Sequence, residues 1–344
     1  MKALHFNSHG SFDALKFGSV SDPKITDDHA LIRVRACAMN HLDVWVLKGW
    51  PELKLPMPHI GGSDIAGEIV ELPKKAFGWR TGDRVVVCPG YVIGEDEWTR
   101  SGEESVSPNY RVIGESSWGG FAEYAAVPLK NLVALPKDFS FSEGAAPLLV
   151  GTTAWRMFKH RVRLQSGETV LIVGAGGGVN SFSVQLAKFF GAKVVALTST
   201  EAKMANARAL GADHVLNYTT NPDWSREVRS LTNGRGVDVV VDNVGSKTIV
   251  QSIRSARRGG RIVTVGNTSG PVVTFDNRLI FTKQLSILGS TMGSAQDFKE
   301  MLEQSIWTKK VRPVIDSEIP LAEGRFGYEK LERGEQFGKV ILIP

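Results

Sequence analysis

The stretch ETVLIVGAGGGVNSFSVQLAKFFGA, residues 168–192, decides the fold class of this 344-residue chain. Residues 169–173 form a short apolar run, which predicts a buried strand. Four glycines follow, namely Gly174, Gly176, Gly177 and Gly178. Residues 179–190 then predict a helix that Gly191 ends. Glycines let the backbone turn tightly against a pyrophosphate, and a helix N-terminus offers it free N–H groups, so the stretch predicts a dinucleotide-binding turn.

Strands and helices continue to alternate after this turn. Further strands are predicted over 193–199, 214–218, 237–245, 260–270 and 284–293. A second helix is predicted over 201–212 and ends at Gly211. Such alternation is typical of a parallel sheet with helices on both faces. The predicted fold class is therefore α/β, with a Rossmann doubly wound parallel sheet.

The first 130 residues show a different pattern, in which short strands are separated by turns. These strands are predicted over 29–39, 64–72, 82–88, 121–128 and 132–136. Together they predict a small β-barrel or sandwich. The tail, residues 314–344, returns to strand, helix and strand. A chain of this length also predicts two domains.

Composition restricts the function classes. Hydrophobic residues make up 42% and charged residues 22% of the chain, an ordinary globular balance that needs no disulfide or metal for stability. The two cysteines, Cys37 and Cys88, suit a reducing compartment. Neither a leader nor a membrane-spanning run is evident, so we expect a cytoplasmic protein without a membrane partner. The formal net charge of +5 is spread along the chain, which gives no support for a nucleic-acid partner.

The end of the second predicted strand indicates which dinucleotide binds. NAD sites place an acid there to hold the ribose hydroxyls. This strand instead ends in Thr198, Ser199 and Thr200, and Lys203 follows. Hydroxyls and an ammonium can donate hydrogen bonds to a 2′-phosphate, whereas a carboxylate would repel it. The pattern therefore predicts NADP(H). The alternative is that Ser199 or Thr200 caps the next helix while Lys203 is a solvated surface residue.

With the glycine turn, the segments AKFFGAKVVALTST, ARALGADHVLNY, VDNVG, RGGRIVTVG and QLSILGST resemble the medium-chain dehydrogenase/reductase superfamily. The resemblance covers nearly the whole chain and includes zinc-type alcohol dehydrogenases and zinc-free quinone oxidoreductases. It implies a GroES-like β-barrel catalytic domain over 1–148, completed by 312–344, and a Rossmann dinucleotide-binding domain over 149–311. One departure is Asn180, where quinone oxidoreductases end their glycine run with another glycine.

The resemblance also implies which residues contact NADP(H). Beyond the glycine turn and the strand end, the matching positions are His41, Thr152, Val179, Tyr218, Asn243, Val265, Gly266, Leu288, Gly289, Ser290 and Lys339. Tyr218 is expected to close one side of the 2′-phosphate site. His41 has two interpretations, because it can lie near the cofactor phosphates or move protons.

Zinc-type members of this family hold a structural and a catalytic zinc, and neither is expected here. By spacing, the structural-zinc positions are Ile93, Asp96, Thr99 and Ser107. The catalytic-zinc positions are Asn40, Ser63 and Leu148, and Leu42 replaces the proton-relay hydroxyl. Structural zinc sites are built from Cys and His, none of which is present at these positions. Asp43 and Asp64 could bind a stray cation, but two carboxylates select poorly for zinc.

Hydride transfer without a metal is the chemistry that remains. The spacing of Asn40 and Asp43 matches the zinc-free quinone oxidoreductases. Hydrogen-bond donors must then hold the charge that grows on the acceptor oxygen. The candidate donors are the Asn40 amide, the Ser63 hydroxyl and the indole N–H of Trp45 or Trp50. Asn40 could equally satisfy backbone groups at a strand end, while Asp43 and Asp64 are expected to orient their neighbours.

Acceptors that delocalise charge need less stabilisation than simple carbonyls do, and aromatic side chains would suit them. Trp45, Trp50, Trp118 and Phe281 are the pocket candidates, with core packing as the alternative for some of them. The predicted function is therefore a zinc-independent, NADP(H)-dependent oxidoreductase that transfers hydride between NADPH and a carbonyl, aryl ketone or quinone.

Two alternatives and the oligomeric state remain open at this point. The chain could reduce the carbon–carbon double bond of enones, or it could bind NADPH without catalysis. The edge strand QLSILGS of the Rossmann sheet favours a homo-oligomer, either a dimer or a tetramer.

Overall fold

In the computed structural model, which describes residues 1–76 and 78–344, the glycine-rich stretch forms the predicted turn. Strand β11 (Thr169–Val173) leads into Gly174, and helix α5 (Gly178–Phe189) follows. Gly174 has a φ of +77°, a left-handed conformation that glycine adopts without strain. The predicted strand, turn and helix are confirmed.

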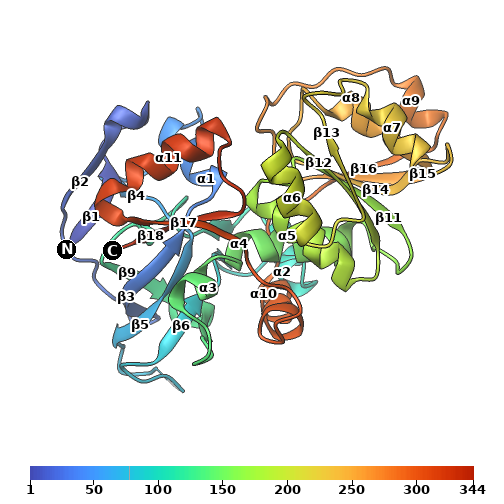
Figure 1. Ribbon diagram of the computed structural model, residues 1–344. Coiled ribbons are helices and arrows are strands. Elements are labelled where there is room, and N and C mark those ends of the chain that lie inside the picture. The colour runs from blue at the N-terminus through green and yellow to red at the C-terminus, as the bar shows by residue number, and fades with distance from the viewer. Residues whose placement is uncertain (77) are drawn as a thin grey trace. The chain divides into compact units, whose positions relative to one another are not determined.

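The chain divides into two compact units (Figure 1). The first comprises Met1–Thr152, Gly293–Leu302 and Pro313–Pro344, and the second comprises Thr153–Met292 and Glu303–Arg312. The sequence analysis placed the boundaries after residues 148 and 311, whereas the structure places them after 152 and 312. The structure also assigns the segment that carries helix α10 (Ala295–Met301) to the first unit.

The second unit is built on a six-stranded parallel sheet in the order β13-β12-β11-β14-β15-β16. Besides β11, its strands are β12 (Lys193–Thr198), β13 (His214–Asn217), β14 (Val237–Asp242), β15 (Ala256–Thr264) and β16 (Ser286–Gly289). The strand order reverses between β11 and β14. In sheets of this kind, ligands bind at such a switch point, outside the carboxyl ends of the strands.

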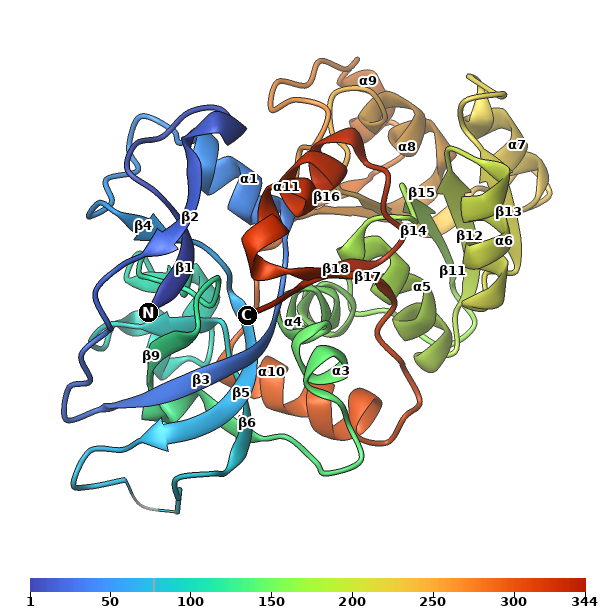
Figure 2. The ribbon, with the colours of Figure 1, turned by 60° about the vertical axis from the view of Figure 1, so that its left-hand side comes forward.

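Helices cover this parallel sheet (Figure 2). Helix α5 packs on β11 and β12, and α6 (Glu201–Ala209) packs on β12 and β13. Helix α8 (Ile249–Ser255) packs on β14 and β15 and contacts α7 (Trp224–Ser230) and α9 (Arg278–Phe281). The prediction of a doubly wound α/β sheet is confirmed.

The first unit is mainly antiparallel. A seven-stranded sheet runs in the order β10-β6-β5-β3-β18-β17, with β9 also paired to β3, and a second sheet has the order β2-β1-β4. The strands of both sheets are β1 (Lys2–Phe6), β2 (Leu15–Ser19), β3 (His29–Ala38), β4 (His59–Ile60), β5 (Asp64–Glu71), β6 (Arg84–Val87), β9 (Tyr124–Pro128), β10 (Leu132–Ala134), β17 (Ile315–Pro320) and β18 (Lys339–Ile343).

Three strand ends converge in the first unit and position the candidate site. In β3 and β5, Ala38 pairs with Asp64, so the end of β3 lies beside the start of β5. The tail strand β18 pairs antiparallel with β3 on its other side, and the Met39 N–H donates to the Val340 carbonyl. Asn40, two residues beyond β3, and Lys339, the first residue of β18, are therefore brought together from opposite ends of the chain.

The first unit also contains helices, most of which the sequence analysis did not predict. These are α1 (His41–Lys48), α2 (Glu97–Arg100), α3 (Phe141–Ala145), α4 (Leu148–Arg156), which extends into the second unit, α10 and α11 (Gly324–Arg333). Only α11, in the tail, was expected. The predicted domain boundary at residue 148 coincides with the first residue of α4.

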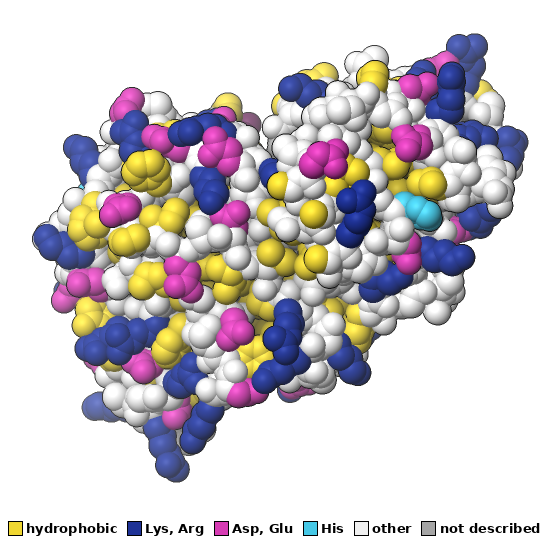
Figure 3. Space-filling model, viewed as in Figure 1, with side chains coloured by type: hydrophobic (Ala, Val, Ile, Leu, Met, Phe, Trp, Pro, Cys, Tyr) yellow, Lys and Arg dark blue, Asp and Glu magenta, His cyan; other side chains and the backbone are white. Residues whose placement is uncertain are grey.

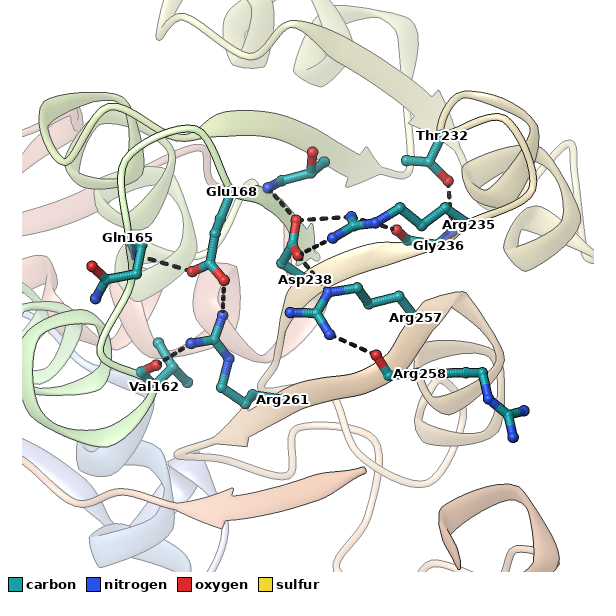
Figure 4. A network of polar contacts seen from close by, with 11 residues as sticks. Val162, Gln165, Glu168, Thr232, Arg235, Gly236, Asp238, Arg257, Arg258 and Arg261 are labelled. Carbon is teal, nitrogen blue, oxygen red and sulfur yellow. Dashed lines mark hydrogen bonds and ion pairs between the residues drawn. The ribbon is translucent and has the colours of Figure 1, made fainter. Parts of the chain in front are cut away.

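A charged network closes the end of the parallel sheet opposite the glycine turn (Figure 4). The Asp238 carboxylate accepts hydrogen bonds from Arg235, from Arg257 and from the Thr169 N–H. Burial alone would raise the pKa of Asp238, but the two guanidinium groups hold it well below its usual range. The network joins the amino ends of β11, β14 and β15, so we assign it a structural role.

Two expectations of the sequence analysis concern the helices and the surface, namely that the protein has no membrane partner and no nucleic-acid partner. Within the described residues, none of the helices has the length and apolar character needed to cross a membrane. On the face seen in Figure 3, Lys and Arg side chains are interspersed with acidic ones and do not gather in one patch.

Candidate active site

Asn40 and Asp43 form the junction between β3 and α1. The buried Asp43 carboxylate accepts the Asn40 N–H through Oδ2 (2.7 Å) and the Gly62 N–H through Oδ1 (3.1 Å). Gly62 has a φ of +96°, and a β-carbon there would meet the Phe121 ring at 2.6 Å, so only glycine fits. Asp43 thus ties the start of α1 to the turn before β5 and orients its neighbours.

Asn40, Asp64 and Lys339 form one buried hydrogen-bonded cluster. The Lys339 Nζ lies 2.5 Å from Asn40 Oδ1 and 3.0 Å from Asp64 Oδ2. The Asn40 Nδ2 donates to the same Asp64 oxygen at 3.0 Å, and the Leu149 N–H donates to the other oxygen at 2.9 Å. Burial raises the pKa of Asp64, and Lys339 and Asn40 oppose that rise. We refer to Asn40, Asp64 and Lys339 as the polar cluster.

Ser63 adjoins the cluster in the chain and carries an unused donor. Its side chain is 0% exposed, and across the described residues its hydroxyl finds no hydrogen-bond partner. A buried hydroxyl without a partner costs free energy, and this cost is offset when the hydroxyl donates a hydrogen bond to a ligand oxygen. Leu148, the third predicted metal position, is buried and offers only its backbone carbonyl, which accepts from the Thr152 hydroxyl.

The predicted aromatic residues have different environments. Trp45 is half-buried on α1, and its ring meets His41 edge to face at 5.1 Å between centroids. Trp50 is 38% exposed, and Trp118 packs on the core while its indole N–H donates to the Pro58 carbonyl. Phe281 lies on α9 in the second unit and is 60% exposed. Core packing, the alternative interpretation, therefore describes Trp118.

His41 follows Asn40 as the first residue of α1. Burial lowers the pKa of its imidazole, although Glu332 opposes this effect, so the ring is neutral at pH 7. A neutral ring offers a phosphate less attraction than a cation does. It retains one donor and one acceptor for a proton relay.

The catalytic-zinc positions do not fit a zinc ion. No group of three His, Cys, Asp or Glu side chains that could hold a metal occurs among residues 1–76 and 78–344. Leu148 has no side-chain donor, and the Lys339 ammonium already contacts Asn40 and Asp64. A cation bound there would be repelled by that ammonium.

The lobe at residues 88–107 has hydrogen bonds at the structural-zinc positions. Asp96 caps helix α2 by accepting the Thr99 N–H at 2.9 Å, and its other oxygen accepts the Ser107 hydroxyl at 2.5 Å. The Ser107 Oγ in turn accepts the Asn109 N–H. The fourth position, Ile93, is 58% exposed. Three of the four positions therefore cross-link the lobe without sulfur ligands.

We expect Asp96→Ala to loosen this lobe, because the substitution removes both the helix cap and the acceptor of Ser107. Amide hydrogen exchange should accelerate at least tenfold at Thr99 and Asn109. Glu95→Ala, which removes a neighbouring carboxylate with neither bond, is the control and should leave exchange unchanged. Equal exchange in both variants would show that the hydrogen bonds do not hold the lobe.

In the second unit, the glycine turn and the start of α5 form the nucleotide-binding element. Of the residues that the structure describes, none caps α5 with a side chain, and its N-cap residue is Gly177. A β-carbon at Gly177 would meet nothing closer than the Gly174 carbonyl at 3.7 Å, so the turn is open on that side. The uncapped N–H groups of Gly178 and Val179 suit a pyrophosphate.

Asn180, the departure from the family pattern, joins three strand ends. Its Nδ2 donates to the Val173 carbonyl at 2.6 Å, and its Oδ1 accepts from Asn243 Nδ2 at 2.8 Å. The Asn243 Oδ1 accepts the Val265 N–H. Asn180 therefore closes the turn through an amide chain that links β11, β14 and β15. Asn243 has both ends of its amide engaged, which favours a positioning role over direct cofactor contact.

The end of β12 holds the residues predicted to select the cofactor. The Thr200 hydroxyl caps α6 by accepting the Lys203 N–H, so the capping alternative is correct for Thr200. Thr198 is 1% exposed, and its hydroxyl has no partner in the part of the chain described. Ser199 and Tyr218 are half-buried beside it. An unused donor at this strand end suits a bound ribose or phosphate oxygen.

The remaining predicted cofactor positions cluster at the ends of β15 and β16. Val265 and Gly266 follow β15, Leu288 and Gly289 end β16, and Ser290 comes next. The Ser290 hydroxyl is also buried and unpartnered within the described chain. Thr152 and Lys339 belong to the first unit, where both side chains make the hydrogen bonds given above.

Sequence reasoning missed the link between Lys339 and the other two residues of the polar cluster. It predicted Asn40 and Asp64 as catalytic and Lys339 as a cofactor ligand. The signal that would have joined them is the pairing of the tail strand with β3, which no local pattern reveals. The Gly62 and Leu149 N–H groups were also missed, because a backbone donor leaves no mark on residue type.

Asp43 makes the free energy of unfolding depend on pH. Burial raises the pKa of Asp43 to about 7, although the N–H groups of Asn40 and Gly62 oppose it. The unfolded chain releases this proton near pH 4, so between about pH 4 and pH 7 the native state binds more protons and stability falls as pH rises. We expect Asp43→Asn to flatten this slope by about 1 kcal/mol per pH unit. Urea unfolding at a series of pH values measures it, and an unchanged slope would contradict the assignment.

Comparison with known proteins agrees with this architecture. The family described as alcohol dehydrogenase GroES-like domain matches residues 26–137, and the family described as zinc-binding dehydrogenase matches residues 178–307. The acryloyl-coenzyme A reductase of Metallosphaera sedula is 33% identical, and the NAD-dependent alcohol dehydrogenase of Sulfolobus acidocaldarius is 30% identical, each over 99% of both chains.

Solved structures give the same result. A crystal structure of an NAD-dependent alcohol dehydrogenase has a TM-score of 0.96 at 39% identity and covers 100% of both chains. The alcohol dehydrogenase of Aeropyrum pernix has a TM-score of 0.91 at 31% identity, again over 100% of both chains. The two units are thus the GroES-like and Rossmann domains. The chain belongs to the medium-chain dehydrogenase/reductase superfamily and is an oxidoreductase that uses a nicotinamide cofactor.

Proposed function

We propose that this oxidoreductase is zinc-independent, prefers NADP(H), and transfers hydride between NADPH and a carbonyl, aryl ketone or quinone. The observation that carries the proposal is the polar cluster, in which the Lys339 ammonium contacts Asn40, one of the positions expected to match a zinc ligand, and Asp64, which follows another, Ser63. When bound, NADPH supplies a hydride from its nicotinamide ring. The residues of this chain have to bind the acceptor and hold the charge that develops on its oxygen.

Two donors in the first unit support this role. Asn40 Nδ2 has two N–H groups, of which Asp64 takes one, so the other is available to an acceptor oxygen. The Ser63 hydroxyl is the second. One well-placed donor of this kind is worth about 3 kcal/mol in a transition state. Acceptors whose charge is delocalised, such as quinones, aryl ketones and enones, need the least help.

Reduction of a carbon–carbon double bond is the second candidate, and the comparisons favour it. Besides the acryloyl-coenzyme A reductase, the crotonyl-CoA reductase of Streptomyces collinus is 29% identical over 96% of this chain. Hydride addition to the β-carbon of an enone or enoyl thioester leaves the charge on an enolate oxygen. The same two donors would stabilise it, so the site permits either reaction.

The product formed from one aryl enone tests the proposal and separates the candidates. NADPH oxidation is followed at 340 nm with an aryl ketone, a quinone, an aryl enone and an enoyl thioester, and the enone product is identified by mass spectrometry and NMR. An allylic alcohol supports carbonyl reduction, and a saturated ketone supports the second candidate. No turnover with any acceptor, despite NADPH binding, would contradict both and leave the non-catalytic alternative.

We further propose that the chain forms a homo-oligomer through strand β16, the edge strand of the Rossmann sheet. Among the described residues its outer edge has no strand partner, and Ile287 is 41% exposed on it. A second copy of β16 could pair with it about a two-fold axis. Ile287→Lys should therefore yield a monomer by light scattering with size exclusion. The control, Leu231→Lys, places a charge at an exposed apolar residue of another surface. A monomeric wild-type protein would contradict this proposal.

A further inference from the structure

Lys339 is a buried cation whose hydrogen bonds are directed at the proposed oxyanion donor. It is the first residue of β18, and its side chain is 4% exposed. A buried ammonium is costly unless it is paired and hydrogen-bonded. Here Asp64 neutralises it, and Asn40 Oδ1 accepts a second N–H at 2.5 Å. Two of its three N–H groups are thus committed to the polar cluster.

These bonds fix which way the Asn40 amide faces. An ammonium only donates hydrogen bonds, so the atom beside Lys339 has to be the amide oxygen. A carboxylate only accepts, so the atom beside Asp64 has to be the amide nitrogen. Turning the amide over would place the NH₂ group against Lys339 and the oxygen against Asp64, which loses both bonds and adds two repulsions. One Nδ2 hydrogen then remains, in a fixed direction.

We propose that Lys339 is a positioning residue that locks and polarises the Asn40 amide, so that its free N–H is held ready for the oxygen of the acceptor. This inference rests on the proposed function, because it assigns Asn40 as the donor. In the step, the acceptor carbon forms a bond to the hydride, and the π pair moves to oxygen, where the Asn40 N–H stabilises it. NADPH becomes NADP⁺, and solvent supplies the proton that completes the product.

The assignment differs from a cofactor-binding role for Lys339, and the two make opposite kinetic predictions. A lysine that binds a cofactor phosphate affects the dissociation constant of NADPH, because a phosphate contact is already present in the ground state. A lysine that orients a transition-state donor affects kcat, because that donor acts on charge that appears only during reaction.

The test compares Lys339→Met, which keeps the length of the side chain without its charge, with Lys339→Arg and the wild type. We expect Lys339→Met to lower kcat 10- to 100-fold while the NADPH dissociation constant stays within twofold. Lys339→Ala should recover at least fivefold in kcat with added ethylammonium, and not with tetramethylammonium, which has no N–H. A tenfold weaker NADPH affinity with unchanged kcat would overturn the proposal, as would a kcat within threefold of wild type.

Lys283→Met is the matched control. Lys283 is a partly buried lysine whose Nζ donates to the carbonyls of Ile253, Arg254 and Ala256 at the end of α8. Its removal should lower the melting temperature without changing kcat. A fall in kcat equal to that of Lys339→Met would show that lost stability explains both results.

A measurement that does not depend on catalysis distinguishes failure of this inference from failure of the proposed function. In protein labelled with ¹⁵N-asparagine and free of cofactor, the Asn40 side-chain amide should exchange slowly with solvent in wild type and at least tenfold faster in Lys339→Met. If the wild type turns over no acceptor but this difference is seen, the proposed function fails and the amide lock stands. If exchange is equal in both proteins, the lock is wrong whatever the activity.

Discussion

Ser199→Asp is expected to reverse the cofactor preference from NADPH to NADH. Ser199 directly follows β12 and is half-buried beside Thr198 and Tyr218. A carboxylate there would repel a 2′-phosphate and accept hydrogen bonds from the ribose hydroxyls of NADH. We expect NADPH to bind about 100-fold more weakly, which corresponds to about 2.7 kcal/mol. NADH binding should stay equal or become tighter.

Fluorescence titration of both cofactors against three proteins measures this effect. The wild type should prefer NADPH about tenfold or more, since one charge-assisted hydrogen bond contributes about 1.5–3 kcal/mol. Ser230→Asp adds the same charge on α7 and is the control, with an expected change below twofold. Two of the relatives described above carry NAD in their names, so equal wild-type dissociation constants for NADPH and NADH would contradict the cofactor proposal.

Asp64→Leu is expected to destabilise the first unit by about 3–5 kcal/mol, the usual cost of leaving a buried charge without its partner. Asp64 is 0% exposed and accepts hydrogen bonds from Lys339, Asn40 and Leu149. Adding Lys339→Met to this variant removes the stranded ammonium. The double variant should therefore regain most of the lost stability, because an apolar pair often replaces a buried ion pair at little net cost.

Urea unfolding of the single and double variants measures the coupling free energy between Asp64 and Lys339. Glu335→Leu removes the exposed ion pair with Arg333 and is the control, with an expected change below about 1 kcal/mol. Additive losses in the double variant would show that Asp64 and Lys339 do not form a buried pair. The stable double variant should also be inactive, because Asn40 has lost both groups that orient it.

The fold was predictable where local patterns determine it. The glycine turn, β12, α6 and the later strands were recognised from apolar runs bounded by glycine, a signal contained within each segment. Helices α1 and α4 were not predicted. Both helices carry boundary signals that the sequence analysis passed over, because Asn40 and Gly49 flank α1 and Pro147 precedes α4. The predicted strand over 29–39 ended one residue before Asn40, and the predicted domain boundary fell at the start of α4, so neither segment was assigned a helix.

Two residues of the polar cluster could be identified as catalytic from the sequence, but the contact that joins them to Lys339 could not. Asn40 and Asp64 were named from positions that match the family, and their proximity follows from the β3–β5 pairing. The contact with Lys339 depends on the tail strand pairing with β3 across 299 residues of sequence separation. Such long-range pairing is set by the whole sheet and leaves no local pattern.

Metal content and turnover, measured on the same sample, test the central claim most directly. The protein is dialysed against chelator, its zinc is determined by elemental analysis, and NADPH oxidation is then followed with an acceptor from the panel. A zinc-independent enzyme should contain less than about 0.1 zinc per chain and keep its full rate, because the Lys339 ammonium contacts Asn40 and Asp64 and would repel a cation bound beside them. Retention of one zinc per chain through dialysis, or activity lost with chelator and restored by added zinc, would contradict the account.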